Sequence, residues 1–375
     1  MYQMRTDQPL ALSLFSGAGG LDIGIRNSGF SVLACVERDP FCCETLRANI
    51  TNEALNTVVI EDDIRKVEPT ALMSKLALKS GQLDLLFGGP PCQAFSQIGK
   101  RLSIHDERGM LLFEMVRFAR TLQPKVILIE QVKGLLNAHD HNGVPGGVFA
   151  MLIEELEELG YKVKSKVILA ADYGVPQMRQ RVFIVATRDE ITFTFPEPTH
   201  SSVENIKPMF GLPIHRTVGD VISALPTPAP RETLGVEDSH IDITPAGDRY
   251  RIHGVPEGEH LAAQYHLPVE QRQKLTKKDT TKFRRMTYQS PAITLRCGEI
   301  FFHPTEDRYL TVREYMRIHT FPDSYILKGA IRGRSGQVKN LDQYRQIANS
   351  VPPLLAQHLG QAVMDCLQEE RTVNK

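Results

Sequence analysis

The sequence lacks the features that mark membrane and secreted proteins. No apolar run approaches the roughly 18 residues that a membrane span needs, and the first ten residues, MYQMRTDQPL, contain no apolar signal core. The six cysteines form no CxxC pair and show no disulfide-like spacing, so we expect reduced thiols and no structural zinc site. These absences predict a cytoplasmic protein that does not bind a membrane.

The chain also lacks net charge and a convincing metal site. Lys and Arg number 44 and so do Asp and Glu, but residues 261–350 hold 16 Lys and Arg against eight Asp and Glu. A local basic excess is typical of a surface that faces nucleic acid, although a solvated face is the commoner explanation. His139, Asp140 and His141 crowd one short loop, which favours a solvated turn over a tetrahedral metal site.

What the sequence does contain is an alternation of strands and helices between residues 11 and 190. The expected strands are 11–15, 31–36, 57–60, 83–87, 125–130, 161–169 and 181–187, and the expected helices are 21–28, 40–49, 109–121 and 147–159. This alternation predicts an α/β fold with a largely parallel sheet covered on both faces. Nine prolines in 191–260 predict a loop-rich second domain with short strands, and helical texture returns at 312–320 and 352–368.

A glycine turn follows the first expected strand, in the stretch LSLFSGAGGLDIGI. Gly17, Gly19 and Gly20 would let a nucleotide-like ligand approach the backbone at a helix N-terminus. Glu37 ends the second strand and Asp63 follows the third, so a carboxylate is available for ribose hydroxyls and another for an adenine amino group. Each acid alone is better explained as a turn or capping residue. Because no phosphate-binding lysine follows the glycines, the pattern favours S-adenosylmethionine.

One cysteine stands in unusual surroundings, in FGGPPCQAFS. Pro90 and Pro91 stop any helix or central strand, and Gly88 and Gly89 permit special backbone angles or a close approach. These residues hold Cys92 at the end of an expected strand, where open α/β sheets bind ligands. An inert buried thiol is the more common case, so this stretch alone does not settle the role of Cys92.

Taken together, the motifs resemble those of the DNA (cytosine-5) methyltransferase family, in family order over nearly the full length. They are LFSGAGGLDIG, Glu37, DDI, GGPPCQAFS, IEQVKGLL, DYGVPQMRQRVFIVATR, RYLTVREYMRIHTFPD and QIANSVPP. The resemblance implies a Rossmann-like mixed sheet with a smaller target recognition domain and a final helix that returns to the large domain. The implied boundaries are 1–189 for the catalytic and cofactor-binding domain, 190–342 for the recognition domain and 343–375 for the returning segment.

The resemblance also assigns site residues. It makes Cys92 the nucleophile, with Glu130, Arg179 and Arg181 as catalytic partners. The expected cofactor-binding residues are Phe15, Gly17, Gly19, Gly20, Glu37, Asp63, Ile64, Pro90, Asn349 and Ser350. The expected DNA-binding residues are Gln93, Ser96, Lys100, Arg101, Lys277, Lys278, Lys282, Arg284, Arg285 and Arg296.

These roles follow from the reaction that the resemblance implies. Cytosine carbon-5 is a poor nucleophile until a thiolate adds at carbon-6. Arg179 is a candidate source of positive charge for that thiolate and of a contact to the ring carbonyl, and protonated Glu130 can donate to ring nitrogen-3. Two departures from the family pattern are Gln131, where Asn is usual, and Ala348, where glycine is usual. We expect activity to survive both.

The resemblance further implies double-stranded DNA as the substrate, base flipping, and a bacterial or phage origin. A monomer is expected, and a cognate restriction endonuclease acting separately is a further partner that no residue establishes. The alternatives are a tRNA cytosine-5 methyltransferase, disfavoured because the Cys-Phe-Thr tripeptide of that branch is missing, and a catalytically silent DNA-binding relative, disfavoured because Cys92, Glu130, Arg179 and Arg181 are all present.

Overall fold

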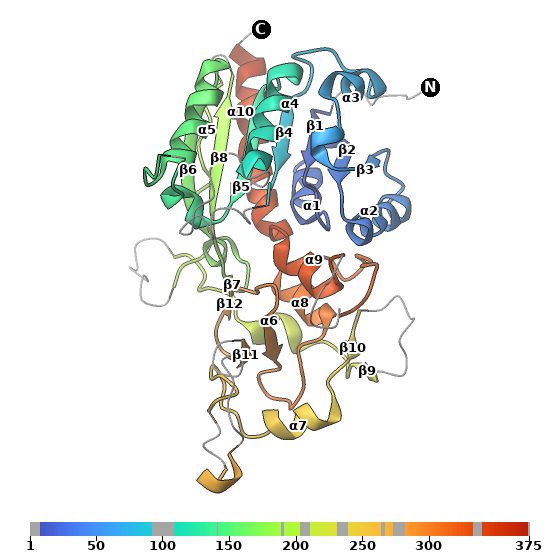
Figure 1. Ribbon diagram of the computed structural model, residues 1–375, viewed down its shortest axis with the longest axis vertical. Helices are drawn as coiled ribbons and strands as arrows, with labels where there is room; N and C mark the ends of the chain where they lie inside the picture. Colours follow the sequence, from blue (N-terminus) through green and yellow to red (C-terminus); the bar gives the residue numbers. More distant parts are fainter. Residues whose placement is uncertain are drawn as a thin grey trace. The chain divides into compact units, whose positions relative to one another are not determined.

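The chain forms two compact units (Figure 1). A computed structural model describes residues 8–91, 109–140, 142–188, 191–202, 211–230, 239–263, 267–272, 282–332 and 340–373. Unit 1 comprises Met1–Leu169, Gln180–Glu197 and Leu355–Lys375, and unit 2 comprises Ala170–Arg179 and Pro198–Leu354. The functional boundaries expected at residues 189 and 342 stay a prediction, because compactness alone does not say which part performs recognition.

Unit 1 is built on a mixed sheet. Its strands within the described residues are β1 (Leu10–Leu14), β2 (Ser31–Glu37), β3 (Val58–Glu61), β4 (Leu85–Gly88), β5 (Val126–Gln131), β6 (Lys162–Leu169) and β8 (Gln180–Thr187). They bond in the order β3-β2-β1-β4-β5-β8-β6, with the first five parallel and β8 antiparallel to both of its neighbours. The predicted α/β fold with a mostly parallel sheet is confirmed.

Helices cover this sheet. They are α1 (Gly20–Asn27), α2 (Pro40–Asn52), α3 (Pro69–Lys75), α4 (Glu114–Leu122), α5 (Gly147–Glu158) and α10 (Pro353–Val373), with short 3-10 turns η1 (Ile64–Lys66), η3 (Gly109–Phe113) and η4 (Lys133–Asn137). Figure 1 shows α4 and α5 in front of the sheet and α10 behind it. The sequence pattern did not indicate α3, and it gave η3 and α4 as one continuous helix.

The last helix packs closely on the first. A Cβ added to Gly24 of α1 would lie 2.3 Å from the Cβ of Ala356 in α10, and one added to Gly360 would lie 2.4 Å from Oγ of Ser28. Glycine is therefore required at both positions by space rather than by backbone angle. Because α1 follows the glycine turn directly, the close packing of α10 fixes the helix that begins at that turn.

The centre of the sheet is buried on both faces. Each residue of β4 and of β5 is buried, as expected for parallel strands covered by helices on either side. β5 reads Val-Ile-Leu-Ile-Glu-Gln, so its polar residues, Glu130 and Gln131, come only at its carboxyl end. The apolar residues of β5 therefore pack in the core, and its two polar residues lie at the end of the strand where a ligand site is expected.

Unit 2 consists of short elements. They are η5 (Ala170–Tyr173), β7 (Gln177–Met178), α6 (Val218–Ile222), β9 (Ala229–Pro230), β10 (Ile241–Asp242), α7 (Ala246–Ile252), η8 (Val269–Gln271), β11 (Phe283–Arg285), β12 (Ala292–Ile293), β13 (Ile300–Phe302), α8 (Val312–Ile318) and α9 (Gln343–Asn349). The strands pair two by two, β9 with β10, β11 with β13 and β7 with β12. Proline lacks the amide donor that a longer ladder needs, which accounts for the short strands in the proline-rich part.

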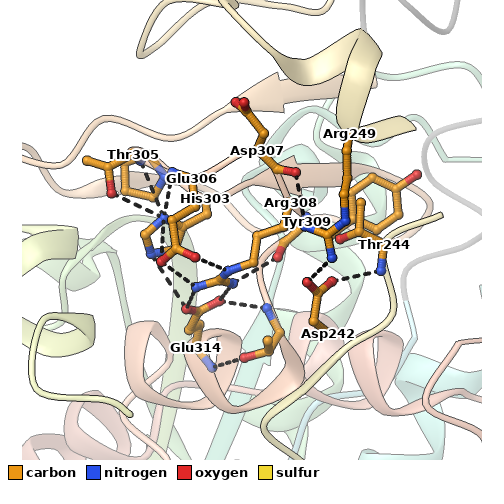
Figure 2. A network of polar contacts seen from close by, with 12 residues as sticks. Asp242, Thr244, Arg249, His303, Thr305, Glu306, Asp307, Arg308, Tyr309 and Glu314 are labelled. Atoms are coloured by element: carbon orange, nitrogen blue, oxygen red, sulfur yellow. Dashed lines mark hydrogen bonds and ion pairs between the residues drawn. The ribbon is translucent and has the colours of Figure 1, made fainter. Parts of the chain in front are cut away.

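A buried ion pair between Arg308 and Glu314 supplements a small apolar cluster in unit 2. Figure 2 shows Arg308 between the carboxylates of Glu306 and Glu314, and its guanidinium lies 2.7 Å from Oε1 of Glu314 and 2.8 Å from Oε2 of Glu306. Glu314 also accepts a bond from the backbone of Thr311 and so caps α8. This one carboxylate therefore joins the start of α8 to the segment that carries Arg308.

Candidate active site

The carboxyl ends of the parallel strands form the candidate site in unit 1. Strand order reverses between β1 and β4, and ligands of open α/β sheets bind at such a switch point. After β1 the backbone turns through Phe15 (φ 56°), Gly17 (φ 55°) and Gly19 (φ 76°) before α1 begins. Positive φ is unusual for phenylalanine and marks a constrained turn. A Cβ on Gly17 would meet no atom within 4 Å, so there is open space beside this turn.

Glu37 orders the glycine turn from the neighbouring strand. Its Oε2 accepts a hydrogen bond from the Gly17 amide at 2.8 Å, and its Oε1 accepts bonds from the amides of Arg38 and Asp39, both at 2.8 Å. Burial raises the pKa of this carboxyl, while the three amide bonds act in the opposite direction. The carboxylate is thus oriented by backbone before any ligand arrives.

Asp63 lies beyond β3 and is bound by an arginine. Arg65 donates to both carboxylate oxygens, at 2.9 Å from Nε and 2.7 Å from a terminal nitrogen. The hydrogen bond from the Arg65 side chain lowers the pKa of Asp63 to about 2. The carboxylate is charged at neutral pH, and an adenine amino group would share it with Arg65. The adjacent Ile64 is buried.

The two glycines before Pro90 are needed for close approach. A Cβ on Gly88 would lie 2.4 Å from the Leu14 carbonyl oxygen of β1, and one on Gly89 would lie 3.2 Å from Oε2 of Glu130. Of the two explanations that the sequence left open, special backbone angles and close approach, the structure supports the second. The end of β4 therefore lies against the catalytic candidate of β5.

Gln131 binds the proline that precedes the expected nucleophile. Its Nε2 donates to the Pro90 carbonyl oxygen at 2.6 Å, and its side chain is buried. The longer amide side chain, in place of the usual Asn, still supplies a donor to the Pro-Cys segment. Cys92 itself lies outside the described residues.

Glu130 is paired with Arg181. The Arg181 Nε lies 2.9 Å from Glu130 Oε1, across the antiparallel β5–β8 pair, and an Arg181 terminal nitrogen donates to the Gln180 carbonyl. Both side chains are largely buried, which strengthens their electrostatic interaction. The carboxyl end of β5 thus offers a carboxylate and a guanidinium next to Gly89 and Pro90.

Arg179 does not fit the role expected for it. It is 1% exposed, and its two terminal nitrogens donate to the carbonyls of Ala348 and Ser350, each at 3.0 Å. Those bonds hold the backbone of the QIANSVPP motif within unit 2. Arg179 is therefore placed to fix the last motif rather than to contact the reacting ring, and the catalytic role expected for Arg181 stays a prediction.

The last motif contains two expected cofactor residues. Asn349 is exposed and its Oδ1 accepts a hydrogen bond from the Cys297 thiol at 2.8 Å. Ser350 is buried, and its carbonyl accepts bonds from Arg179 and from His319. Sequence analysis assigned no role to Cys297 or His319. His319 lies in the motif RYLTVREYMRIHTFPD, whereas Cys297 lies in none of the quoted motifs.

The expected DNA contacts divide into exposed and buried side chains. Lys282 is exposed, and Arg296 is 67% exposed with Glu299 at 3.5 Å. Arg284 is half-buried and donates to the Gly258 carbonyl at 2.7 Å. Gln93, Ser96, Lys100, Arg101, Lys277 and Lys278 lie outside the described residues.

Arg285 is a second correction. It is buried, and its guanidinium donates to the carbonyls of Ile252, His303 and Glu306 and to the carboxylate of Asp307. A phosphate contact would require these bonds to break in a buried place. Arg285 therefore stabilises unit 2 and is removed from the expected DNA contacts.

The described residues contain no cluster of three or more His, Cys, Asp or Glu side chains that could hold a metal ion. Among the same residues, no helix is both long and apolar enough to cross a lipid bilayer.

Comparisons with known proteins indicate the family of this chain. The family model described as C-5 cytosine-specific DNA methylase matches residues 11–365. The chain is 36% identical over 373 residues to the type II methyltransferase M.PspPI of Psychrobacter sp., covering 95% of this chain and 79% of that protein. It is 40% identical over 254 residues to the type II methyltransferase M.AquIA of Picosynechococcus sp., covering 65% of this chain and 98% of that protein.

Solved structures show the same fold. A prophage-encoded protein of Escherichia coli superposes with a TM-score of 0.69 at 21% identity, covering 96% of this chain and 100% of that chain. DNMT2 of Spodoptera frugiperda superposes with a TM-score of 0.61 at 19% identity, covering 95% of this chain and 100% of that chain. Because the family model spans residues 11–365, this chain belongs to the C-5 cytosine-specific DNA methylase family.

Proposed function

We propose that this protein transfers a methyl group from S-adenosylmethionine to carbon-5 of a flipped-out cytosine in double-stranded DNA, through a covalent bond between Cys92 and carbon-6. The observation that carries the proposal is the Glu130–Arg181 pair, with Gly89 directly against Glu130 at the strand end that leads to Cys92. A carboxyl group, a guanidinium and a thiol reached from adjacent strands are the groups that this reaction requires.

The residues at the ends of β1, β2 and β3 fit an adenosine ligand. The open space beside Gly17 admits a ligand against the backbone, and Glu37 is already oriented towards the turn. The partly buried Phe15 offers apolar surface for an adenine ring, and Asp63 offers a charged acceptor. When bound, S-adenosylmethionine supplies an electrophilic methyl group on a sulfonium sulfur.

The protein residues would act on the cytosine in sequence. The Cys92 thiolate adds to carbon-6, and the electron pair of the carbon-5–carbon-6 double bond makes carbon-5 nucleophilic towards the methyl group. Glu130 in its protonated form donates to ring nitrogen-3, and Arg181 beside it is placed to bind the ring carbonyl. After methyl transfer, a base removes the carbon-5 proton, the double bond re-forms and the thiolate leaves.

The cytosine must leave the DNA stack for this chemistry, at a cost of roughly a few kcal/mol. We assign recognition of the surrounding sequence to unit 2, on the exposed side chains of Lys282 and Arg296. The likeness to type II methyltransferases favours a role in marking the host's own DNA at one short site. A separate nuclease would read the same site.

The test is to express the protein in a bacterium without cytosine methylation and to map 5-methylcytosine across its genome. We expect methylation at one short motif, and none from Cys92→Ala, which should retain binding of S-adenosylmethionine because the glycine turn is untouched. Methylation by Cys92→Ala would overturn the covalent mechanism. Methylation confined to RNA would replace the DNA substrate by a tRNA.

A further inference from the structure

A fully buried glutamine joins two segments of unit 2 that lie far apart in the sequence. Gln177 belongs to β7, which pairs with β12 so that Gln177 lies opposite Ala292. Its Oε1 accepts a hydrogen bond from the Leu295 amide at 3.2 Å, and its Nε2 lies 2.9 Å from Nδ1 of His319. Gln177 therefore contacts both the segment after β12 and the end of α8.

His319 continues the connection to the last motif. Its side chain is fully buried, and its Nε2 lies 2.8 Å from the carbonyl oxygen of Ser350. Because the Gln177 oxygen faces a peptide N–H, its amide nitrogen must donate to Nδ1, so the ring proton lies on Nε2 and is donated to Ser350. The order Leu295, Gln177, His319, Ser350, which we call the relay, thus has one consistent set of donors and acceptors.

The segment that the relay holds carries an exposed arginine. Residues 294–298 follow β12. Thr294 donates to the Met178 carbonyl at 2.9 Å, and Cys297 donates to Oδ1 of Asn349 at 2.8 Å. Arg296 lies between Leu295 and Cys297, which are both hydrogen-bonded to other segments, and its side chain is 67% exposed. The Leu295 amide before Arg296 is thus bonded to β7 and the Cys297 side chain after it is bonded to the last motif, while the guanidinium itself is exposed.

Such fixing matters more for base recognition than for phosphate binding. A guanidinium that reads guanine must place two donors on two acceptors at the same time, whereas a phosphate accepts a cation over a wide range of positions. We infer that Gln177 and His319 are positioning residues for Arg296, so that the choice of DNA sequence depends on the buried relay. This inference rests on the proposed function, since it requires a DNA site to be read.

The experiment compares methyl transfer to the mapped motif with transfer to duplexes in which one base pair is changed. The discrimination ratio is kcat/KM for the motif divided by kcat/KM for the changed site. We expect Arg296→Ala and His319→Leu each to lower this ratio about tenfold, the size of one good bidentate base contact. His319→Gln retains an acceptor for Gln177 and a donor for Ser350, so its ratio should stay within about threefold of that of the unaltered protein.

Two further variants separate positioning from general stability. His240 is also buried in unit 2 and bonds to Thr311 and Pro226, so His240→Leu should lower thermal stability similarly while leaving the ratio unchanged. In the double variant Arg296→Ala with His319→Leu, the ratio should fall no further than in Arg296→Ala alone, because both changes remove the same contact.

The outcomes distinguish this inference from the function on which it rests. An unchanged ratio in folded His319→Leu, or losses that add in the double variant, would overturn the relay and leave the methyltransferase proposal intact. Should His319→Leu fail to fold, Gln177→Met decides, since methionine is of similar size but removes both the acceptor for the Leu295 amide and the donor to His319. A fall of about tenfold supports the inference, and no change overturns it. Absence of methylation by the unaltered protein would overturn both proposals.

Discussion

Two arginines that stand two residues apart in the sequence belong to different compact units and have different surroundings. Arg181 lies near the start of β8 in unit 1, where its Nε is 2.9 Å from Oε1 of Glu130. Arg179 ends a segment of unit 2, where it is 1% exposed and donates to two backbone carbonyls. The same residue type in one short motif therefore binds a carboxylate at one position and backbone carbonyls at the other, and only the first arrangement fits the proposed catalytic role.

The most severe test of this contrast is Arg181→Ala. Loss of the guanidinium beside Glu130 should lower the rate of methyl transfer in a single turnover about 10²–10³-fold, the usual cost of removing one preorganised donor to a reacting group. Arg181→Lys keeps the charge but loses the planar donor geometry, so its rate should lie between those of the unaltered protein and Arg181→Ala. An unchanged rate in Arg181→Ala would mean that Arg181 is not a catalytic residue.

Arg179→Ala should instead reduce stability. The buried Ala348 carbonyl would lose this donor, while the Ser350 carbonyl would keep its bond from His319, so we expect the free energy of unfolding to fall by about 2 kcal/mol. Urea denaturation followed by circular dichroism measures this change. Arg47→Ala is the matched control, because Arg47 pairs with Glu61 at the surface and should contribute less than about 1 kcal/mol. Equal losses for the two variants would contradict the structural role of Arg179.

Gly89→Ala tests whether the position of Glu130 relative to Arg181 matters for the rate. The added Cβ would lie 3.2 Å from Glu130 Oε2, so the carboxylate must shift by a few tenths of an ångström relative to Arg181. A displacement of this kind should lower kcat about tenfold with little change in stability. At Gly247 an added Cβ would meet nothing within 4 Å, and Gly247→Ala should leave kcat unchanged. Wild-type kcat in Gly89→Ala would show that the position of Glu130 is not critical.

The smallest effect is expected for the ion pair between Asp63 and Arg65. The folded pKa of Asp63, about 2, lies below its ordinary value of 3.8, so its charged form stabilises the folded state above pH 3.8, and this contribution is lost as the pH falls through about 2. Asp63→Asn should therefore cost about 1 kcal/mol at pH 7, after allowance for solvent screening, and much less near pH 2. A pH-independent difference between the two proteins in urea denaturation would refute this assignment.

Much of unit 1 could be predicted from the sequence. Each expected strand lies within two residues of an observed one. The central strands β4 and β5 were detectable because buried parallel strands are short apolar runs bounded by polar or glycine residues. The short helix α3 was not indicated, since seven residues give too little periodicity. Unit 2 yielded fewer elements, because strands of two or three residues have no detectable alternation and depend on contacts between distant segments.

The sequence by itself determined the family and the mostly parallel α/β sheet, because motifs, glycines and short apolar runs are local patterns, while its assignment of catalytic residues stays a prediction. It could not separate Arg179 from Arg181, nor Arg285 from its exposed neighbour Lys282, because burial depends on which distant carbonyls and carboxylates lie nearby. Only the tertiary structure placed the Ala348 and Ser350 carbonyls at Arg179, and only it joined Gln177 to His319 across 142 residues of chain. Hydrogen bonds between distant segments are a property of the folded backbone, and no local pattern records them.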